Sequence, residues 1–139
     1  MRIGFTGTRN GMTDRQKRQL KEGIIFYQYS EGNFEFHHGG CIGSDEEAHD
    51  LAYNMNVKIV IHPPIDDKYA MEYEIYRDKN LDVEILPAKD YLDRNHDIVD
   101  ACDLIIAAVE TREEQLRSGT WATIRYARKH NKRLVILEP

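Results

Sequence analysis

The sequence predicts an α/β fold with three layers, in which helices cover both faces of a mainly parallel β-sheet. Short apolar runs alternate with helical patterns along all 139 residues, and this alternation is typical of parallel sheets with right-handed crossovers. The run at residues 104–109 is almost continuously apolar, as expected of a strand that is buried on both faces. The expected architecture is therefore a Rossmann-like three-layer sandwich.

The first half of the chain predicts three strands and two helices. Thr13 and Gln16 form a capping box that opens one helix, and Ser44 and Glu47 form a second capping box. In the second helix, apolar residues recur at i, i+3, i+4 and i+7, which is the spacing of one helical face. The expected strands in this half are residues 2–6, 34–38 and 57–61.

The second half predicts three further strands and two helices. Pro63 and Pro64 end the third strand, and the charged, tyrosine-rich segment 65–82 is expected to be a loop with a helical turn. After it we expect a short strand, a helix, the buried strand, a polar loop, a helix and a closing strand. In order, these are residues 83–86, 89–101, 104–109, 110–117, 119–130 and 133–137.

Length and composition predict one domain, residues 1–139, with 41% hydrophobic residues to build its core. No apolar run approaches the roughly 20 residues that cross a bilayer, and the first residues read as a strand rather than a signal peptide. Cys41 and Cys102 do not make a disulfide framework, so we expect a reducing, cytoplasmic location. The net charge of −5 argues against a nucleic-acid partner.

Three segments of unusual composition lie at expected strand-to-helix junctions, at residues 7–11, 39–45 and 117–120. In a parallel sheet such junctions meet at the edge formed by the carboxyl ends of the strands. Ligands of doubly wound sheets bind outside this edge. The residues alone therefore predict a ligand site there.

The first of these segments offers a flexible backbone and one arginine. Gly7 permits close approach of the backbone, Thr8 has a free hydroxyl, and Arg9 could form a forked contact with a phosphate or carboxylate. The alternative is an ordinary strand-to-helix turn with a surface arginine.

The second segment combines glycines with a helix start. Ser44 is expected to cap the helix, whose amino-terminal end carries partial positive charge and suits an anion. The acidic first turn would repel a phosphate but could accept hydrogen bonds from ribose hydroxyls. The alternative is a well-capped helix with an acidic first turn. The glycines are Gly39, Gly40 and Gly43, and the acidic residues are Asp45, Glu46 and Glu47.

The third segment again ends a loop and begins a helix. Ser118 and Thr120 offer hydroxyls, and Gly119 permits close approach. Trp121 could stack on a base, although packing in the core is the favoured interpretation.

Arg94 and Asn95 lie early in a helix that should start beside the same edge. Both side chains could reach a phosphate or the edge of a base. The alternative is a solvated charged helix face.

The histidines invite a metal interpretation. His37 and His38 are adjacent on an expected strand, and adjacent strand residues point to opposite faces. No cysteine or histidine spacing matches a structural zinc site. We therefore expect no metal site and no cofactor.

Together these motifs resemble the SLOG superfamily, the Rossmann-like domains named for Smf and Lonely Guy. The run GSDEEAH at residues 43–49 resembles the Gly-x-Asp-x-x-Ala-His run of the DNA-processing protein A (Smf) family. Arg94-Asn95, followed by Ile98 and Val99, resembles its Arg-Asn-x-x-Ile element, and the SGT run at residues 118–120 resembles its third motif. The resemblance spans most of the chain.

The resemblance implies three different activities. Smf-family proteins bind single-stranded DNA, and Lonely Guy enzymes hydrolyse the N-glycosidic bond of nucleoside 5′-monophosphates with a catalytic glutamate. Ala122 and Thr123 stand where that glutamate is expected, which disfavours hydrolysis. Other SLOG domains bind nucleotide-derived signals, and family analogy implies a homodimer.

The sequence therefore predicts a protein that senses or sequesters a nucleotide-type small molecule. Asp45 would contact the sugar, and Arg9 would border one end of the ligand together with Gly7 and Thr8. The phosphates would be held by Arg94, Asn95, Arg117, Ser118, Gly119 and Thr120. One alternative is an N-glycosidase in which Asp45, Glu46 or Glu47 is the acid or nucleophile, and the other is a single-stranded DNA-binding module.

Overall fold

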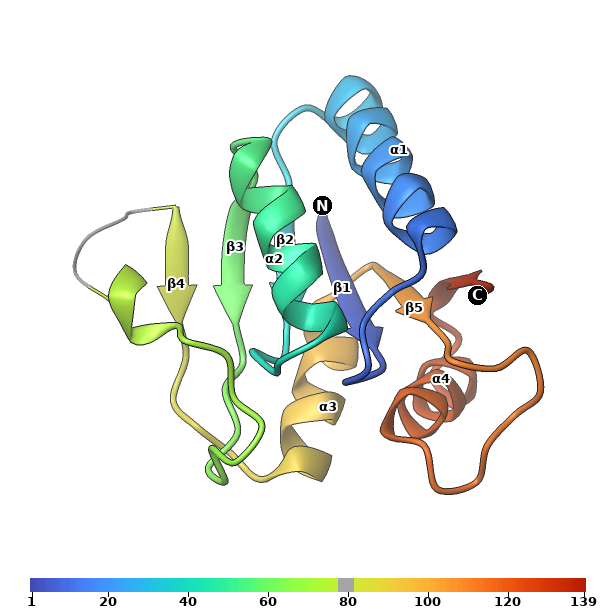
Figure 1. Cartoon of the computed structure of the whole chain (residues 1–139). Coiled ribbons are helices and arrows are strands. Elements are labelled where there is room, and N and C mark those ends of the chain that lie inside the picture. Colours follow the sequence, from blue (N-terminus) through green and yellow to red (C-terminus); the bar gives the residue numbers. More distant parts are fainter. Residues whose placement is uncertain (78–81) are drawn as a thin grey trace.

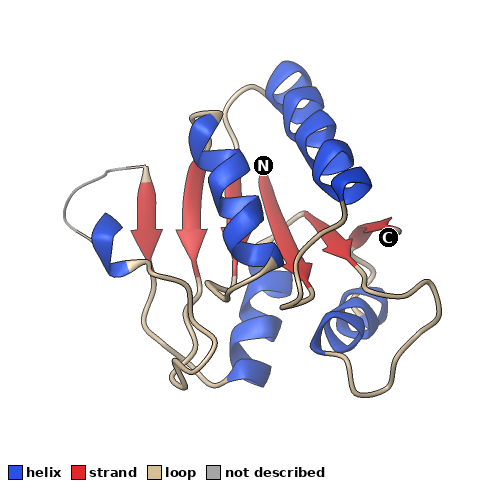
Figure 2. Ribbon diagram, in the orientation of Figure 1, coloured by secondary structure: helices blue, strands red, loops and turns tan. Residues whose placement is uncertain are grey.

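The computed structural model describes residues 1–77 and 82–139, which form an α/β sandwich. All pairings in its six-stranded sheet are parallel. Helices cover both faces of the sheet (Figure 1 and Figure 2). The predicted fold class, a Rossmann-like three-layer sandwich, is therefore confirmed.

Every strand and helix expected from the sequence is present, with bounds that differ by at most two positions. The strands are β1 (Arg2–Gly7), β2 (Glu35–His38), β3 (Lys58–Ile61), β4 (Val83–Ile85), β5 (Leu104–Ala108) and β6 (Arg133–Leu137). The helices are α1 (Asp14–Glu31), α2 (Ser44–Asn54), α3 (Tyr91–Ala101) and α4 (Gly119–Lys129). The expected helical turn is the 3₁₀ helix η1 (Glu74–Tyr76), whereas residues 78–81 of that segment lie outside the described residues. No helix among the described residues is long and apolar enough to cross a bilayer.

The strand order β4-β3-β2-β1-β5-β6 places a switch point between β1 and β5. From β1 the chain builds outward through β2 and β3 to β4, and it then crosses back to add β5 and β6 on the other side. Helix α1 contacts α2, and α3 contacts α4; the two pairs lie on opposite faces of the sheet (Figure 1). A switch point of this kind leaves a crevice outside the carboxyl ends of the two strands.

Apolar side chains fill both spaces between the sheet and the helices. On the α1–α2 face, Phe5 and Phe36 stack with ring centroids 5.9 Å apart. On the opposite face, Trp121 is 5% exposed and packs with Ile124 and Val109. The prediction that Trp121 belongs to the core is confirmed.

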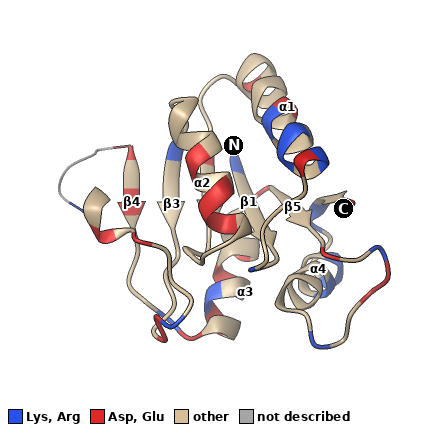
Figure 3. Cartoon of the chain, viewed as in Figure 1, with Lys and Arg blue, Asp and Glu red and all other residues tan. Residues whose placement is uncertain are grey.

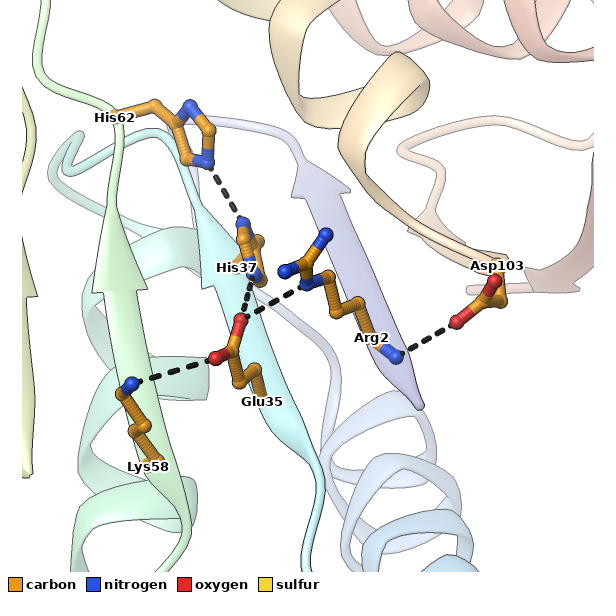
Figure 4. Close-up of polar contacts among 6 residues, drawn as sticks. All are labelled: Arg2, Glu35, His37, Lys58, His62 and Asp103. Atoms are coloured by element: carbon orange, nitrogen blue, oxygen red, sulfur yellow. Dashed lines mark hydrogen bonds and ion pairs between the residues drawn. The ribbon is translucent and has the colours of Figure 1, made fainter.

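A buried line of hydrogen bonds links β2 to the residue after β3 (Figure 4). Glu35 Oε1 lies 3.0 Å from His37 Nε2, and His37 Nδ1 lies 2.8 Å from His62 Nε2. Arg2 and Lys58 form ion pairs with the Glu35 carboxylate at 3.2 and 3.3 Å. Two buried histidines therefore depend on each other and on Glu35 for their hydrogen bonds.

His38 takes part in a second buried pair, in which its Nε2 lies 2.9 Å from His49 Nδ1. His38 bonds to His49 of α2, whereas His37 bonds to His62, so the prediction that His37 and His38 point apart is confirmed. Among the described residues, no group of three or more His, Cys, Asp and Glu side chains is arranged to hold a metal ion.

Burial makes these histidines sensitive to pH. Loss of water lowers the pKa of His37, and it lowers the pKa of His62 to about 4. The same cause lowers the pKa of His38 and His49. Below about pH 6.5 the unfolded chain therefore binds more protons than the folded protein. Their contribution to stability is complete above that pH and is lost as the pH falls through their lowered pKa values, which for His62 means about 4.

Between pH 7 and pH 5, we expect the free energy of unfolding of the wild-type protein to fall by about 2 kcal/mol because of His62 alone. The free energy of unfolding of the His62→Gln protein should fall by about this amount less over the same pH range, because glutamine does not titrate. Urea unfolding at the two pH values measures the difference. His130→Gln changes an exposed histidine and should keep the wild-type dependence. Equal pH dependence of wild type and His62→Gln would contradict the prediction.

Candidate functional site

A cavity of about 670 Å³ lies at the carboxyl edge of the sheet, at the switch point between β1 and β5. Its walls come mainly from the loops after β1, β2, β3 and β5, the first turns of α3, and the start of α4. Segments that are far apart in the sequence thus meet around one space. The predicted site residues that line it are Gly7, Thr8, Arg9, Gly39, Asp45, Arg94, Asn95, Arg117, Ser118, Gly119 and Thr120.

Ser44 has a different role from the predicted one. The N-cap of α2 is Gly43, and no side chain caps this helix. Ser44 Oγ instead donates a hydrogen bond to the carbonyl oxygen of Thr8 at 2.6 Å. The predicted capping box of Ser44 and Glu47 is therefore wrong, because the hydroxyl bonds to the loop after β1 instead. The predicted residues that do not line the cavity are Gly40, Gly43, Ser44, Glu46 and Glu47.

Two of the glycines are required for packing between loops. Gly43 has a φ of 83°, and a Cβ atom there would overlap the carbonyl group of Arg9. A Cβ atom on Gly7 would lie 2.5 Å from Ser44 Cβ. The close approach that these glycines permit is therefore made to another segment of the same chain.

Glu47 supports the loop after β1. Its Oε1 accepts a hydrogen bond from Met12 N at 2.6 Å, and its Oε2 forms an ion pair with Lys17 Nζ at 2.8 Å. The carboxylate therefore ties the start of α2 to the start of α1, outside the cavity.

Arg94 forms part of the cavity floor and is 5% exposed. Its Nη1 donates to the carbonyl oxygens of Gly39 and His62, the latter at 3.2 Å. Its Nε donates to Asn95 Oδ1 at 2.8 Å. Since these groups occupy much of its hydrogen-bonding capacity, Arg94 supplies the floor chiefly with positive charge.

Asp45 is a buried carboxyl group in the cavity wall, 7% exposed. Its Oδ2 accepts a hydrogen bond from Cys41 N at 3.2 Å. Burial raises the pKa of Asp45 to about 6, although the positive charge of Arg94 acts in the opposite direction. A carboxyl group with such a pKa can both donate and accept protons near neutral pH.

The start of α4 is the cavity wall best suited to an anion. Ser118 caps the helix, with its Oγ accepting from Trp121 N at 3.2 Å, and the first turn has no acidic residue. In contrast, the first turn of α2 has three acidic residues, seen in red in Figure 3. No atom lies within 4 Å of where a Cβ on Gly119 would be. The first backbone N–H groups of a helix have no partner within it. Ser118 accepts from that of Trp121, which leaves those of Gly119 and Thr120 to receive a ligand.

Two tyrosines of the cavity wall, Tyr69 and Tyr91, were not predicted from the sequence. The guanidinium carbon of Arg9 lies 3.8 Å from the centre of the Tyr69 ring. Tyr91 lies at the start of α3, and its hydroxyl donates to the carbonyl oxygen of Asp66 at 3.1 Å. The high tyrosine content of segment 65–82 was the available signal for Tyr69.

The chain resembles solved structures, but it matches no known sequence family. No protein-family model matches the chain, and no curated protein matches it. One similar solved structure is a molybdenum cofactor binding protein from Rippkaea orientalis, 18% identical with a TM-score of 0.69. The match covers 97% of this chain and 74% of that protein.

Two further structures extend this comparison. The molybdenum cofactor carrier protein of Chlamydomonas reinhardtii is 18% identical with a TM-score of 0.63, over 97% of this chain and 75% of that one. DNA processing protein A of Helicobacter pylori, described as binding single-stranded DNA, is 19% identical with a TM-score of 0.67. The match covers 98% of this chain and 64% of that protein. The predicted resemblance to SLOG domains is thus confirmed for the fold: the chain has the Rossmann-like fold of these proteins.

Proposed function

We propose that the protein binds a nucleotide or a nucleotide-derived signalling ligand in this cavity, and that it senses or sequesters the ligand without consuming it. The main support is that Arg117 and a helix start without acidic residues line the same cavity. Phosphates bind at such helix starts because the N–H groups and the helix dipole both favour negative charge.

The remaining walls suit the uncharged parts of a nucleotide. Asp45 can accept a hydrogen bond from a ribose hydroxyl, and Tyr69 and Tyr91 offer flat apolar surface. The volume of about 670 Å³ lies within the range of small-molecule sites. Two structural neighbours are described as binding the molybdenum cofactor, which supports a small-molecule ligand. We further propose a homodimer in a reducing cytosol, where Cys41 and Cys102 stay free.

A second candidate is a phosphoribohydrolase that cleaves the N-glycosidic bond of a nucleoside 5′-monophosphate. The pKa of about 6 at Asp45 favours it, because such a carboxyl group can protonate a leaving base. Glu46 and Glu47, the other acids considered, do not line the cavity.

Binding of single-stranded DNA, as described for one structural neighbour, is the remaining alternative. The net charge of −5 disfavours it, because such binding depends on releasing counterions from phosphates through basic side chains.

The test is to denature the purified protein and identify the released small molecules by mass spectrometry. The protein is then incubated with nucleoside mono- and diphosphates, cyclic nucleotides and the molybdenum cofactor, and the products are separated by chromatography. We expect one ligand to be bound and recovered intact. Release of free base over many turnovers would replace the binding proposal with the hydrolase.

Gly119→Ala tests whether a phosphate approaches the start of α4. Its Cβ would project into open space, so folding stability should stay constant or rise by up to about 1 kcal/mol. Binding of the identified ligand should weaken by about 1.5–3 kcal/mol, because the methyl group blocks a charge-assisted hydrogen bond to the backbone.

The matched control is Gly23→Ala in α1, where a Cβ also meets no atom within 4 Å. It should gain similar stability and leave binding unchanged, as measured by thermal melts and calorimetry. Unchanged affinity of Gly119→Ala would place the phosphate elsewhere.

A further inference from the structure

The tyrosine-rich segment after β3 is fixed in place beside the cavity. Ile42 N donates to Tyr69 O and Met71 N donates to Gly40 O, each at 2.8 Å, around a short antiparallel bridge. These bonds attach the segment to the loop after β2. The position of Tyr69 is therefore determined by backbone pairing.

Tyr69 and Arg9 form a stacked pair in the cavity wall. The guanidinium carbon of Arg9 lies 3.8 Å from the centre of the Tyr69 ring, and both residues line the cavity. Arg9 is an exposed residue, and its guanidinium carbon lies over the Tyr69 ring. A planar guanidinium can stack on a second flat ring, which an ammonium group cannot do.

We propose that the Tyr69–Arg9 pair is the platform on which the flat ring of a nucleoside monophosphate stacks. This inference rests on the proposed function, and it assigns Arg9 to the base rather than to the phosphate. The segment after β3 and the start of α4 lie on opposite sides of the loop after β1 (Figure 1). The ring and the phosphate would thus bind at opposite ends of the cavity, as they lie at opposite ends of a mononucleotide.

Lysine at position 9 separates the two possible roles of the arginine. Arg9→Lys keeps the positive charge that a phosphate contact needs, but it removes the plane that a ring needs. Tyr69→Leu removes the support beneath the guanidinium and keeps an apolar side chain.

The experiment measures binding of AMP, GMP, CMP and UMP, and of ribose 5-phosphate, which has no base, by calorimetry. We expect Arg9→Lys and Tyr69→Leu each to weaken the tightest mononucleotide about tenfold, and to change ribose 5-phosphate less than about twofold. Tyr29→Leu is the control, because Tyr29 lies on α1 and is 93% exposed. Thermal melts establish that each variant is folded.

Three results would overturn the platform. If a variant weakens ribose 5-phosphate as much as the mononucleotide, then Arg9 contacts the phosphate. If Arg9→Lys changes neither ligand, then the pair does not touch the base. If the wild-type protein binds none of the five compounds, then the platform for a nucleoside monophosphate fails, whereas the proposed function is decided separately by the small molecule that denaturation releases.

Discussion

Replacement of Arg94 by methionine is expected to lower the free energy of unfolding by about 3–5 kcal/mol. Methionine retains much of the apolar stem, but the charged end is lost. The carbonyl oxygens of Gly39 and His62 then lose a donor, and the negative charge of Asp45 loses its favourable electrostatic interaction with Arg94. Removing one of two buried opposite charges is costly because the other stays buried without it.

Urea unfolding at pH 8 measures this loss. Arg125→Met is the control, because Arg125 pairs with Glu114 at the surface, and such pairs contribute about 0–1 kcal/mol. If the pairing explanation holds, Arg94→Met should cost less in a chain that also has Asp45→Asn. An Arg94→Met protein as stable as the Arg125→Met protein would show that the buried contacts of Arg94 contribute little.

Asp45→Asn is expected to stabilise the ligand-free protein by about 3 kcal/mol above pH 7. The folded-state pKa of Asp45 is raised from 3.8 to about 6, so folding favours the neutral acid. Its contribution to stability is complete below pH 3.8 and is lost as the pH rises through about 6. Asparagine resembles the neutral acid at every pH, so the gain should be only about half as large at pH 5.

Urea unfolding at pH 5 and pH 8 tests this expectation, with Asp50→Asn as the control. Asp50 is an exposed carboxylate on the same helix, and its replacement should change stability by about 0.5 kcal/mol or less. The Asp45→Asn protein should also bind the ligand more weakly, because an amide cannot replace a carboxylate that accepts two hydroxyl hydrogen bonds. A loss of stability at pH 8 would mean that Arg94 stabilises Asp45 as an ion.

The elements of the fold were predictable because their signals are local. The capping box of Thr13 and Gln16 involves residues three positions apart, and both of its hydrogen bonds form, at 3.0 and 3.1 Å. The same pattern at Ser44 and Glu47 gave a wrong prediction, because their partners come from the loop after β1 and from α1. Contacts between distant segments replaced the local cap, and nothing within four residues of Ser44 indicates them.

The candidate site was predictable in part for the same reason. The carboxyl edge of a parallel sheet follows from strand order, so residues between a strand and the next helix, such as Arg9 and Ser118, could be assigned to one cavity. The place of Tyr69 depends on backbone pairing with the loop after β2. The raised pKa of Asp45 depends on how deeply the carboxyl group is buried. No local sequence pattern predicts the position of Tyr69 or the raised pKa of Asp45.

The central position of β1 has a consequence for how the chain folds during synthesis. β1 is made first, and it pairs on one side with β2 and on the other with β5, where Ile3 lies opposite Leu104. Ribosomes add about 5–20 residues per second, so β1 waits on the order of 5–20 s for its second partner. Until then one edge of the strand and the apolar surface beside it stay uncovered, which favours aggregation and chaperone binding. A nascent chain stalled before residue 104 should therefore be a chaperone substrate, and one released after residue 137 should not.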